Sequence, residues 1–106
     1  MITNDGICIR FYVAENVRHR GVLVYDWLLQ TAVKLGLPGG SAFRAIAGFG
    51  RHHRMHEQHF FELAGEVPVE IVFFVDADEE ARLLGAIQAE GLSLFFARQQ
   101  VSYGVI

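Results

Sequence analysis

The residues with the clearest chemical potential lie in one stretch near the middle of this 106-residue chain. Residues 45–47 are apolar, two closely spaced glycines follow at Gly48 and Gly50, and the sequence then becomes cationic. Glycine permits close approaches that a side chain would forbid. Nearby guanidinium groups offer planar donors suited to phosphate or carboxylate. The stretch therefore predicts a site for a small anion.

The predicted ligand-binding set is Arg44, Gly48, Phe49, Gly50, Arg51, His52 and His53. Its glycines would allow backbone approach, its arginines would meet the charge of the ligand, and its histidines would tune or complete the site. A competing interpretation places Arg44 on a strand surface and treats the later arginines as solvated loop charges, because short motifs often give false positives.

Histidine supplies an alternative chemistry in the same region. His52, His56 and His59 are spaced i, i+4 and i+7 and would share a face if the segment were helical. Neutral imidazoles bind zinc, copper or nickel. The chain has no paired cysteine and no strict metal motif, so solvated loop histidines are the favoured interpretation and a metal site is the alternative.

No catalytic constellation is evident, and the chain is expected not to be an enzyme. Ser41 and Ser93 lack a nucleophile signature, and Glu79 with Glu80 is interpreted as a solvated helix start. Asp76 could support a histidine in space, but the sequence does not place it. No cofactor is expected to be required for folding.

Composition predicts a single domain over residues 1–106, with 52% hydrophobic and 20% charged residues. A net charge of −3 argues against general nucleic-acid binding, which needs a broad basic face. The single cysteine, Cys8, is interpreted as a small buried side chain. No signal peptide is visible and the apolar runs are too short to cross a bilayer, so a cytoplasmic location is expected.

Two segments alternate in the manner of strands with one core face. In residues 6–14, the side chains expected to face the core are those of Ile7, Ile9, Phe11 and Val13. Their opposite face carries Cys8, Arg10 and Tyr12. Residues 67–75 repeat the alternation with Val67, Val69, Ile71, Phe73 and Val75. Shorter strands are expected over residues 41–47 and 92–101.

Two segments have helical spacing. The first covers residues 20–35 and ends before Gly36 and Pro38; its apolar stripe is Tyr25, Leu28, Leu29, Ala32 and Leu35. Leu23, Val24 and Trp27 lie off that stripe. The second begins at residues 78–80 and ends at Gly91; its core-facing residues are expected to be Ala81, Leu83, Leu84 and Ile87.

The element order β-α-β-β-α-β predicts an α+β, ferredoxin-like sandwich, in which two helices cover one face of a four-stranded antiparallel sheet. The uncovered face would carry Tyr12, Val72, Phe74 and one of Phe95 and Phe96. An exposed apolar face usually has a partner. A homo-oligomer that packs sheet against sheet is therefore expected.

Three motifs occur in order along the chain: His19-Arg20-Gly21, residues 37–42 (Leu-Pro-Gly-Gly-Ser-Ala) and residues 44–50. Together they resemble the DUF190 family, which is similar to PII signalling proteins. The resemblance covers essentially the whole chain. It implies a ferredoxin-like protomer assembled as a trimer, with a flexible loop between the second and third strands that reports ligand binding. It also implies a regulated partner, for which a membrane transporter or channel is a candidate.

The Gly48-Phe49-Gly50-Arg51 run is similar to the base of the PII effector loop, where backbone and arginine approach nucleotide phosphates. His52 stands where PII proteins carry glutamine, so the usual 2-oxoglutarate response is not carried over. Residues 89–93 offer neither lysine nor enough glycines for the PII phosphate-binding loop. Tight ATP binding in the PII manner is not expected, and a smaller nucleotide or another anion remains open.

These observations predict a PII-like trimeric regulator whose loop, about residues 50–66, orders or rearranges when a small anion binds at its base. An adenine nucleotide is one candidate effector. Phe60 and Phe61 are interpreted as core residues first and as docking residues second. The alternatives are a metal-binding trimer that uses the histidine segment and an interaction subunit that binds no small molecule.

Overall fold

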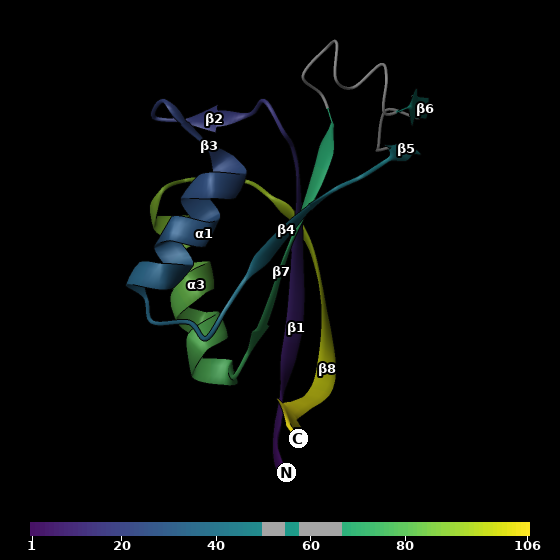
Figure 1. Cartoon of the computed structure of the whole chain (residues 1–106). Coiled ribbons are helices and arrows are strands. Elements are labelled where there is room, and N and C mark those ends of the chain that lie inside the picture. The colour runs from purple at the N-terminus through teal and green to yellow at the C-terminus, as the bar shows by residue number, and fades with distance from the viewer. Residues whose placement is uncertain (50–54, 58–66) are drawn as a thin grey trace.

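Four strands form one antiparallel sheet in the computed structural model, which describes residues 1–49, 55–57 and 67–106. The strands are β1 (Ile2–Ala14), β4 (Ser41–Arg44), β7 (Pro68–Val75) and β8 (Phe95–Val105), in the spatial order β4-β7-β1-β8. Both helices, α1 (Val24–Lys34) and α3 (Ala77–Ala89), lie on the same side of this sheet (Figure 1). The predicted ferredoxin-like fold is confirmed.

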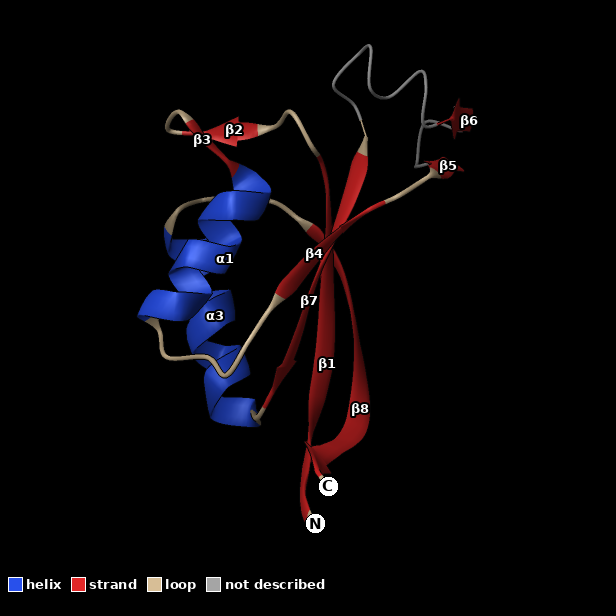
Figure 2. Ribbon diagram, in the orientation of Figure 1, coloured by secondary structure: helices blue, strands red, loops and turns tan. Residues whose placement is uncertain are grey.

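Two short hairpins extend this basic arrangement, as Figure 2 shows. β2 (Arg18–His19) pairs with β3 (Val22–Leu23) just before α1. β5 (Ala47–Phe49) pairs with β6 (Met55–Glu57) in the connection between β4 and β7. That connection leaves the sheet at the end opposite the two chain termini (Figure 1).

The core lies between the helices and the two central strands, β1 and β7. Their register places Ile9 opposite Phe73 and Phe11 opposite Ile71. The rings of Phe11 and Phe73 meet edge to face, with centroids 6.1 Å apart. The predicted alternation of residues 67–75 is confirmed, because all five side chains expected to face the core are buried: Val67, Val69, Ile71, Phe73 and Val75.

The first helix begins later than the sequence predicts. Arg20 has φ 52° and Gly21 has φ 81°, and two successive residues with positive φ make the tight turn between β2 and β3. The chain therefore forms a hairpin where residues 20–23 were expected to be helical. Val24, which lies off the predicted stripe, is buried in the same core as Leu28 and Ala32.

Glycines end both helices in the same way. After α1, Gly36 has φ 77°, and the amide of Leu37 donates to the carbonyl of Ala32. After α3, Gly91 has φ 69°, and the amide of Leu92 donates to the carbonyl of Ile87. Both are Schellman motifs, in which glycine takes the left-handed position that satisfies the last carbonyls.

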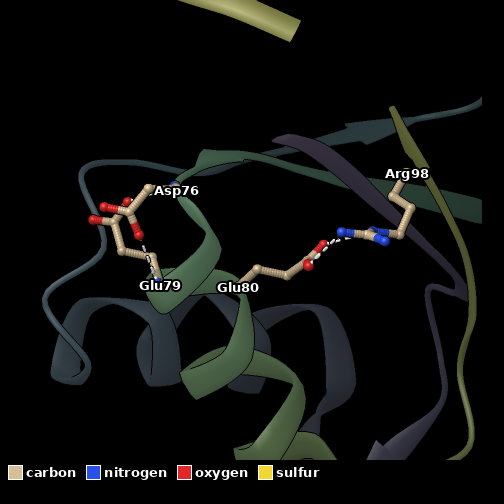
Figure 3. Close-up of polar contacts among 4 residues, drawn as sticks. All are labelled: Asp76, Glu79, Glu80 and Arg98. Carbon is tan, nitrogen blue, oxygen red and sulfur yellow. Dashed lines mark hydrogen bonds and ion pairs between the residues drawn. The ribbon is translucent and has the colours of Figure 1, made fainter. Parts of the chain in front are cut away.

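The second helix begins with a capping box. The amide of Glu79 donates to Oδ1 of Asp76, and the amide of Asp76 donates to Oε1 of Glu79, both at 2.8 Å (Figure 3). These two bonds satisfy free amides at the helix start. The predicted inner face is corrected at Ala81, which is exposed, whereas Leu83 and Ile87 are buried.

The β1–β8 pairing decides which of two neighbouring phenylalanines faces away from the helices. Phe95 lies opposite Tyr12 on the uncovered face, whereas Phe96 lies opposite Phe11 on the helix side. The ring centroids of Phe11 and Phe96 are 6.2 Å apart. Cys8 lies on the uncovered face and is 1% exposed, so the predicted small buried cysteine is confirmed.

Strand limits also differ from the predicted ones. The expected strand over residues 41–47 is divided, because β4 ends at Arg44 and β5 begins at Ala47. β8 starts and ends later than residues 92–101, and β1 begins at Ile2, so the two strands continue as a paired ribbon. Among the described residues, neither helix is long and apolar enough to span a membrane.

Core packing generates a first prediction. Leu28→Ala, at a fully buried position of α1, should lower the free energy of unfolding by about 2–5 kcal/mol, because it removes apolar contacts and leaves a cavity. Val33→Ala changes a residue of the same helix that is 76% exposed and should cost less than about 0.5 kcal/mol. Urea unfolding at one fixed protein concentration measures both; equal losses would contradict the described core.

Candidate functional site

Arg44, the first residue of the predicted anion set, ends β4 at the edge of the sheet. It lies opposite Val69, whose buried side chain shows that this position faces the helices. The guanidinium Nη2 of Arg44 contacts Oε1 of Glu15, just beyond β1. Because β7 lies between β4 and β1, this ion pair reaches across β7.

Backbone hydrogen bonds fix the base of the connection that follows. The amide of Glu15 donates to the carbonyl of Val67 at 2.7 Å, and the amide of Ala45 donates to the carbonyl of Pro68 at 2.9 Å. Both ends of the connection between β4 and β7 are therefore held to the sheet. A ligand at Arg44 would touch this fixed base.

A small pocket lies beside the Arg44–Glu15 pair. Its volume is about 250 Å³ and it is lined by Glu15, Tyr25, Ala42, Phe43, Arg44 and Val69. Its lining combines two charged residues with apolar ones that include the buried Val69. An arginine beside apolar walls is a chemistry that suits a small anion with a nonpolar part.

The remaining residues of the predicted anion set divide between two groups. Gly48 and Phe49 belong to β5, and Gly48 pairs with His56 of β6. A Cβ added at Gly48 would meet nothing within 4 Å in the described part of the chain, so packing there does not require a glycine. The predictions for Gly50, Arg51, His52 and His53 fall outside the described residues.

The alternative metal site requires a helix, but the described residues of this segment form a strand. His56 lies in β6, so the helical spacing that would align it with His52 and His59 does not apply at that residue. His52 and His59 lie outside the described residues, as do Phe60 and Phe61. Within residues 1–49, 55–57 and 67–106, no three histidine, cysteine or acidic residues gather as a metal site. The metal site stays a prediction.

A larger pocket opens on the uncovered face of the sheet. It measures about 360 Å³, and its lining residues are Pro38, Gly39, Gly40, Ser41, Phe43, Val72, Phe74 and Tyr103. Its walls are largely apolar, and Phe43 and Phe74 are 57% and 47% exposed. This chemistry fits apolar packing better than the binding of an anion.

On the same face, a tyrosine and a glutamate are cross-strand neighbours. Tyr12 lies opposite Glu70, and burial raises the pKa of the Tyr12 hydroxyl, with a hydrogen bond to Glu70 and the negative charge of Glu70 adding to the effect. Arg10 Nε lies 3.9 Å from Glu70 Oε1 and acts against this rise. Tyr12 is therefore uncharged near neutral pH.

The DUF190 family model, described as an uncharacterized ACR, matches residues 6–93. The chain belongs to the DUF190 family. A UPF0166 protein of Aquifex aeolicus (strain VF5) is 32% identical over 74 residues, which is 70% of each chain.

Solved structures show that this DUF190 chain has the fold of PII-like proteins. CPII of Thiomonas intermedia K12, in a complex with ADP and bicarbonate, is 17% identical with a TM-score of 0.68, over 98% of this chain and 93% of CPII. A PII-like signaling protein of Thermus thermophilus is 14% identical with a TM-score of 0.64, over 97% and 93% of the two chains. At these identities the likeness establishes the fold alone.

Two of the DUF190-like motifs have structural roles. At Gly40, an added Cβ would lie 2.5 Å from the ring of Phe73, so only glycine fits against this core residue. In the His19-Arg20-Gly21 motif, His19 Nε2 and Arg20 Nη2 lie 3.2 Å and 3.3 Å from Glu90 Oε2. These contacts join the β2–β3 hairpin to the end of α3.

The acidic residues of α3 are structural, and one prediction about them was wrong. Glu79 belongs to the capping box, but Glu80 is not a solvated helix residue. It is 7% exposed and accepts two hydrogen bonds from Arg98 of β8, at 2.9 and 2.7 Å (Figure 3). Asp76, considered as a support for a histidine, instead caps the helix. Figure 3 shows both arrangements on the same helix.

Glu15 and Tyr25 are site residues that sequence reasoning missed. Glu15 continues the alternation of Ile7 to Val13 onto the helix side, and this signal was available in the sequence. Its contact with Arg44 was not, because it depends on β7 lying between the two strands.

The buried carboxylate gives a second prediction. Arg98→Ala leaves Glu80 without its partner and should lower the free energy of unfolding by about 1–3 kcal/mol, less than for a fully buried pair because the Arg98 side chain is 51% exposed. The double variant Arg98→Ala/Glu80→Gln removes the unpaired charge and should recover part of this loss. Urea unfolding compares them; no loss in the single variant would refute the role of the pair.

Proposed function

We propose that this DUF190 chain is a PII-like regulatory protein that binds a small anionic effector at the base of the connection between β4 and β7. The observation that carries the proposal is the position of Arg44 at that base, beside a pocket that can admit an anion. The fold supports it, because structures with the same fold hold ADP with bicarbonate, and ADP with AMP and bicarbonate.

Pocket size helps to choose between effectors. A volume of about 250 Å³ is below the range of about 300–1,000 Å³ typical of ligand pockets. A bicarbonate or a single phosphate group fits inside it, whereas a whole adenine nucleotide would extend beyond it. The proposed site therefore holds the charged end of an adenine nucleotide, or a small anion alone, at Arg44. Gly48, Gly50 and Arg51 are proposed to complete the site, with Phe49, His52 and His53 beside them.

The uncovered sheet face is proposed to form a homotrimer. Phe43, Phe74 and Phe95 are each roughly half exposed on that face, and the apolar-walled pocket lies among the first two. Large apolar patches are uncommon on monomers and mark surfaces that pack against a partner. Packing of sheet against sheet would bury these rings and would bring neighbouring protomers together.

Regulation requires the effector to prefer one state of the protein, because a ligand with equal affinity for two states shifts neither. The fixed ends of the β4–β7 connection make this segment the proposed reporter of binding. A role as a regulator rather than an enzyme is part of the proposal, as is a cytoplasmic location. A membrane transporter or channel as the regulated partner is proposed from the family resemblance alone.

The effector proposal predicts a specific pattern of thermal shifts. ADP, AMP or bicarbonate at about 100 times its Kd should stabilise the protein by about 2.7 kcal/mol. Arg44→Ala and Arg51→Ala should each weaken binding at least about tenfold, because each removes a charge-assisted hydrogen-bond donor. Arg18→Ala is the matched control, since Arg18 donates to its own hairpin at Gly21.

Other outcomes of this screen favour the alternatives. A shift with Zn²⁺ or Ni²⁺ that His56→Ala abolishes, without any anion effect, would support the metal-binding trimer. Stability that responds to none of these ligands would support an interaction subunit, and would contradict the effector proposal.

Assembly generates a separate prediction. Sedimentation should give a particle of three chains of 11.9 kDa each. Phe74→Asp should dissociate it, because a charge would be buried between sheets. Val33→Asp places the same charge on the exposed face of α1 and should leave the trimer intact. A wild-type monomer, or a trimer unaffected by Phe74→Asp, would refute the proposed interface.

A further inference from the structure

We infer that Glu15 is an internal competitor of the effector: an anion binds at Arg44 by replacing the Glu15 carboxylate on the guanidinium. The inference rests on the proposed function and specifies what limits affinity at that site. It assigns a role to a residue outside the predicted anion set. It follows from the contact between Arg44 and Glu15 at the rim of the pocket that would receive the ligand.

A carboxylate is the same kind of group that the site is proposed to bind. An arginine fork holds a carboxylate or a phosphate through the same planar N–H donors. Glu15 therefore occupies donor positions that an incoming anion would use. A second negative charge beside it would be repelled, so a ligand at Arg44 and an intact Arg44–Glu15 contact oppose each other.

The chain contains a second arginine–glutamate pair that shows how a permanent contact differs. Arg98 holds Glu80 through Nε and Nη2, and the Glu80 side chain is 9% exposed. The Arg44–Glu15 contact runs from Nη2 to Oε1, with side chains 53% and 26% exposed. Ion pairs open to solvent contribute little, with typical values of about 0–1 kcal/mol. An anion that binds Arg44 more strongly than this small energy can therefore displace the Glu15 carboxylate from the guanidinium.

Glu15 also connects the site with the segment proposed to report binding. Its amide is held to the carbonyl of Val67, which lies directly before β7 where the connection rejoins the sheet. The backbone of Glu15 is fixed by this bond, so its carboxylate can leave Arg44 by side-chain rotation alone. The ligand-free contact thus stabilises one state of the loop base, and the ligand stabilises the other.

The effect on affinity has a definite sign. If only the fraction of molecules with Arg44 released can bind, the apparent Kd equals the intrinsic Kd divided by that fraction. Glu15→Gln removes the charge but keeps the shape and the backbone hydrogen bond. It should therefore tighten binding, by about 2- to 6-fold for a solvent-accessible pair worth up to about 1 kcal/mol.

The test is titration calorimetry with ADP and with sodium bicarbonate on four proteins: wild type, Glu15→Gln, Arg44→Ala and Arg44→Ala/Glu15→Gln. Asp78→Asn is the charge-matched control, because Asp78 lies at the start of α3, beyond the opposite end of β7. The melting temperature of each protein without ligand shows that it is folded. Tighter binding in Glu15→Gln, absent from Asp78→Asn and from the double variant, is the expected result.

The outcomes separate this inference from the proposed function. Weaker or unchanged binding in Glu15→Gln, while Arg44→Ala still weakens it, would overturn the competitor role and leave the effector site standing. A gain that persists in the double variant would also overturn it, because the gain would not act through Arg44. No binding of either ligand by wild type or Glu15→Gln would refute both. Binding by Glu15→Gln alone would support the inference in its strongest form.

Discussion

Two helices cover one face of the four-stranded sheet, and this one-sided layering is the constraint on which the other features depend. The central strands, β1 and β7, place a continuous apolar set against the helices, including Ile9, Phe11 and Phe73. Their other face also carries apolar side chains, but no second layer packs on it within the described part of the chain. The fold thus assigns one face of the sheet to the core and leaves apolar side chains exposed on the other, among them Phe74 and Phe95.

The same topology creates the candidate site. In the order β4-β7-β1-β8, β4 and β1 are both antiparallel neighbours of β7, so they finish at the same end of the sheet. Arg44 and Glu15 are 29 residues apart in sequence, yet they meet across β7 on the helix side. The connection between β4 and β7 leaves from this end, so the Arg44–Glu15 contact lies at the base of a long segment. The site is a consequence of strand order rather than of a local motif.

Local patterns predicted most of the fold, and they failed where a turn or a distant contact decided the outcome. Alternation identified β1 and β7 because each strand has one buried face. The first helix was placed too early because Arg20 and Gly21 form a hairpin turn that periodicity does not reveal. Glu80 looked like a solvated helix residue, since its partner Arg98 is on the last strand.

The candidate site was predictable in its chemistry but not in its arrangement. The arginine at position 44 and the glycine at 48 were recognisable from residue type and spacing, and the structure places them on β4 and β5. The contact between Glu15 and Arg44 was not recognisable, because a residue's partner across an intervening strand depends on sheet order. The same sheet order brings Arg44 and Glu15 into the contact from which the competitor role of Glu15 is inferred.

A crystal structure of the protein grown with saturating ADP and bicarbonate would test this account most directly. The account predicts a trimer with anion density within hydrogen-bonding distance of the Arg44 guanidinium, and with the Glu15 carboxylate turned away from it. Anion density elsewhere on the molecule, with the Arg44–Glu15 contact intact, would contradict the assignment of the site to this loop base.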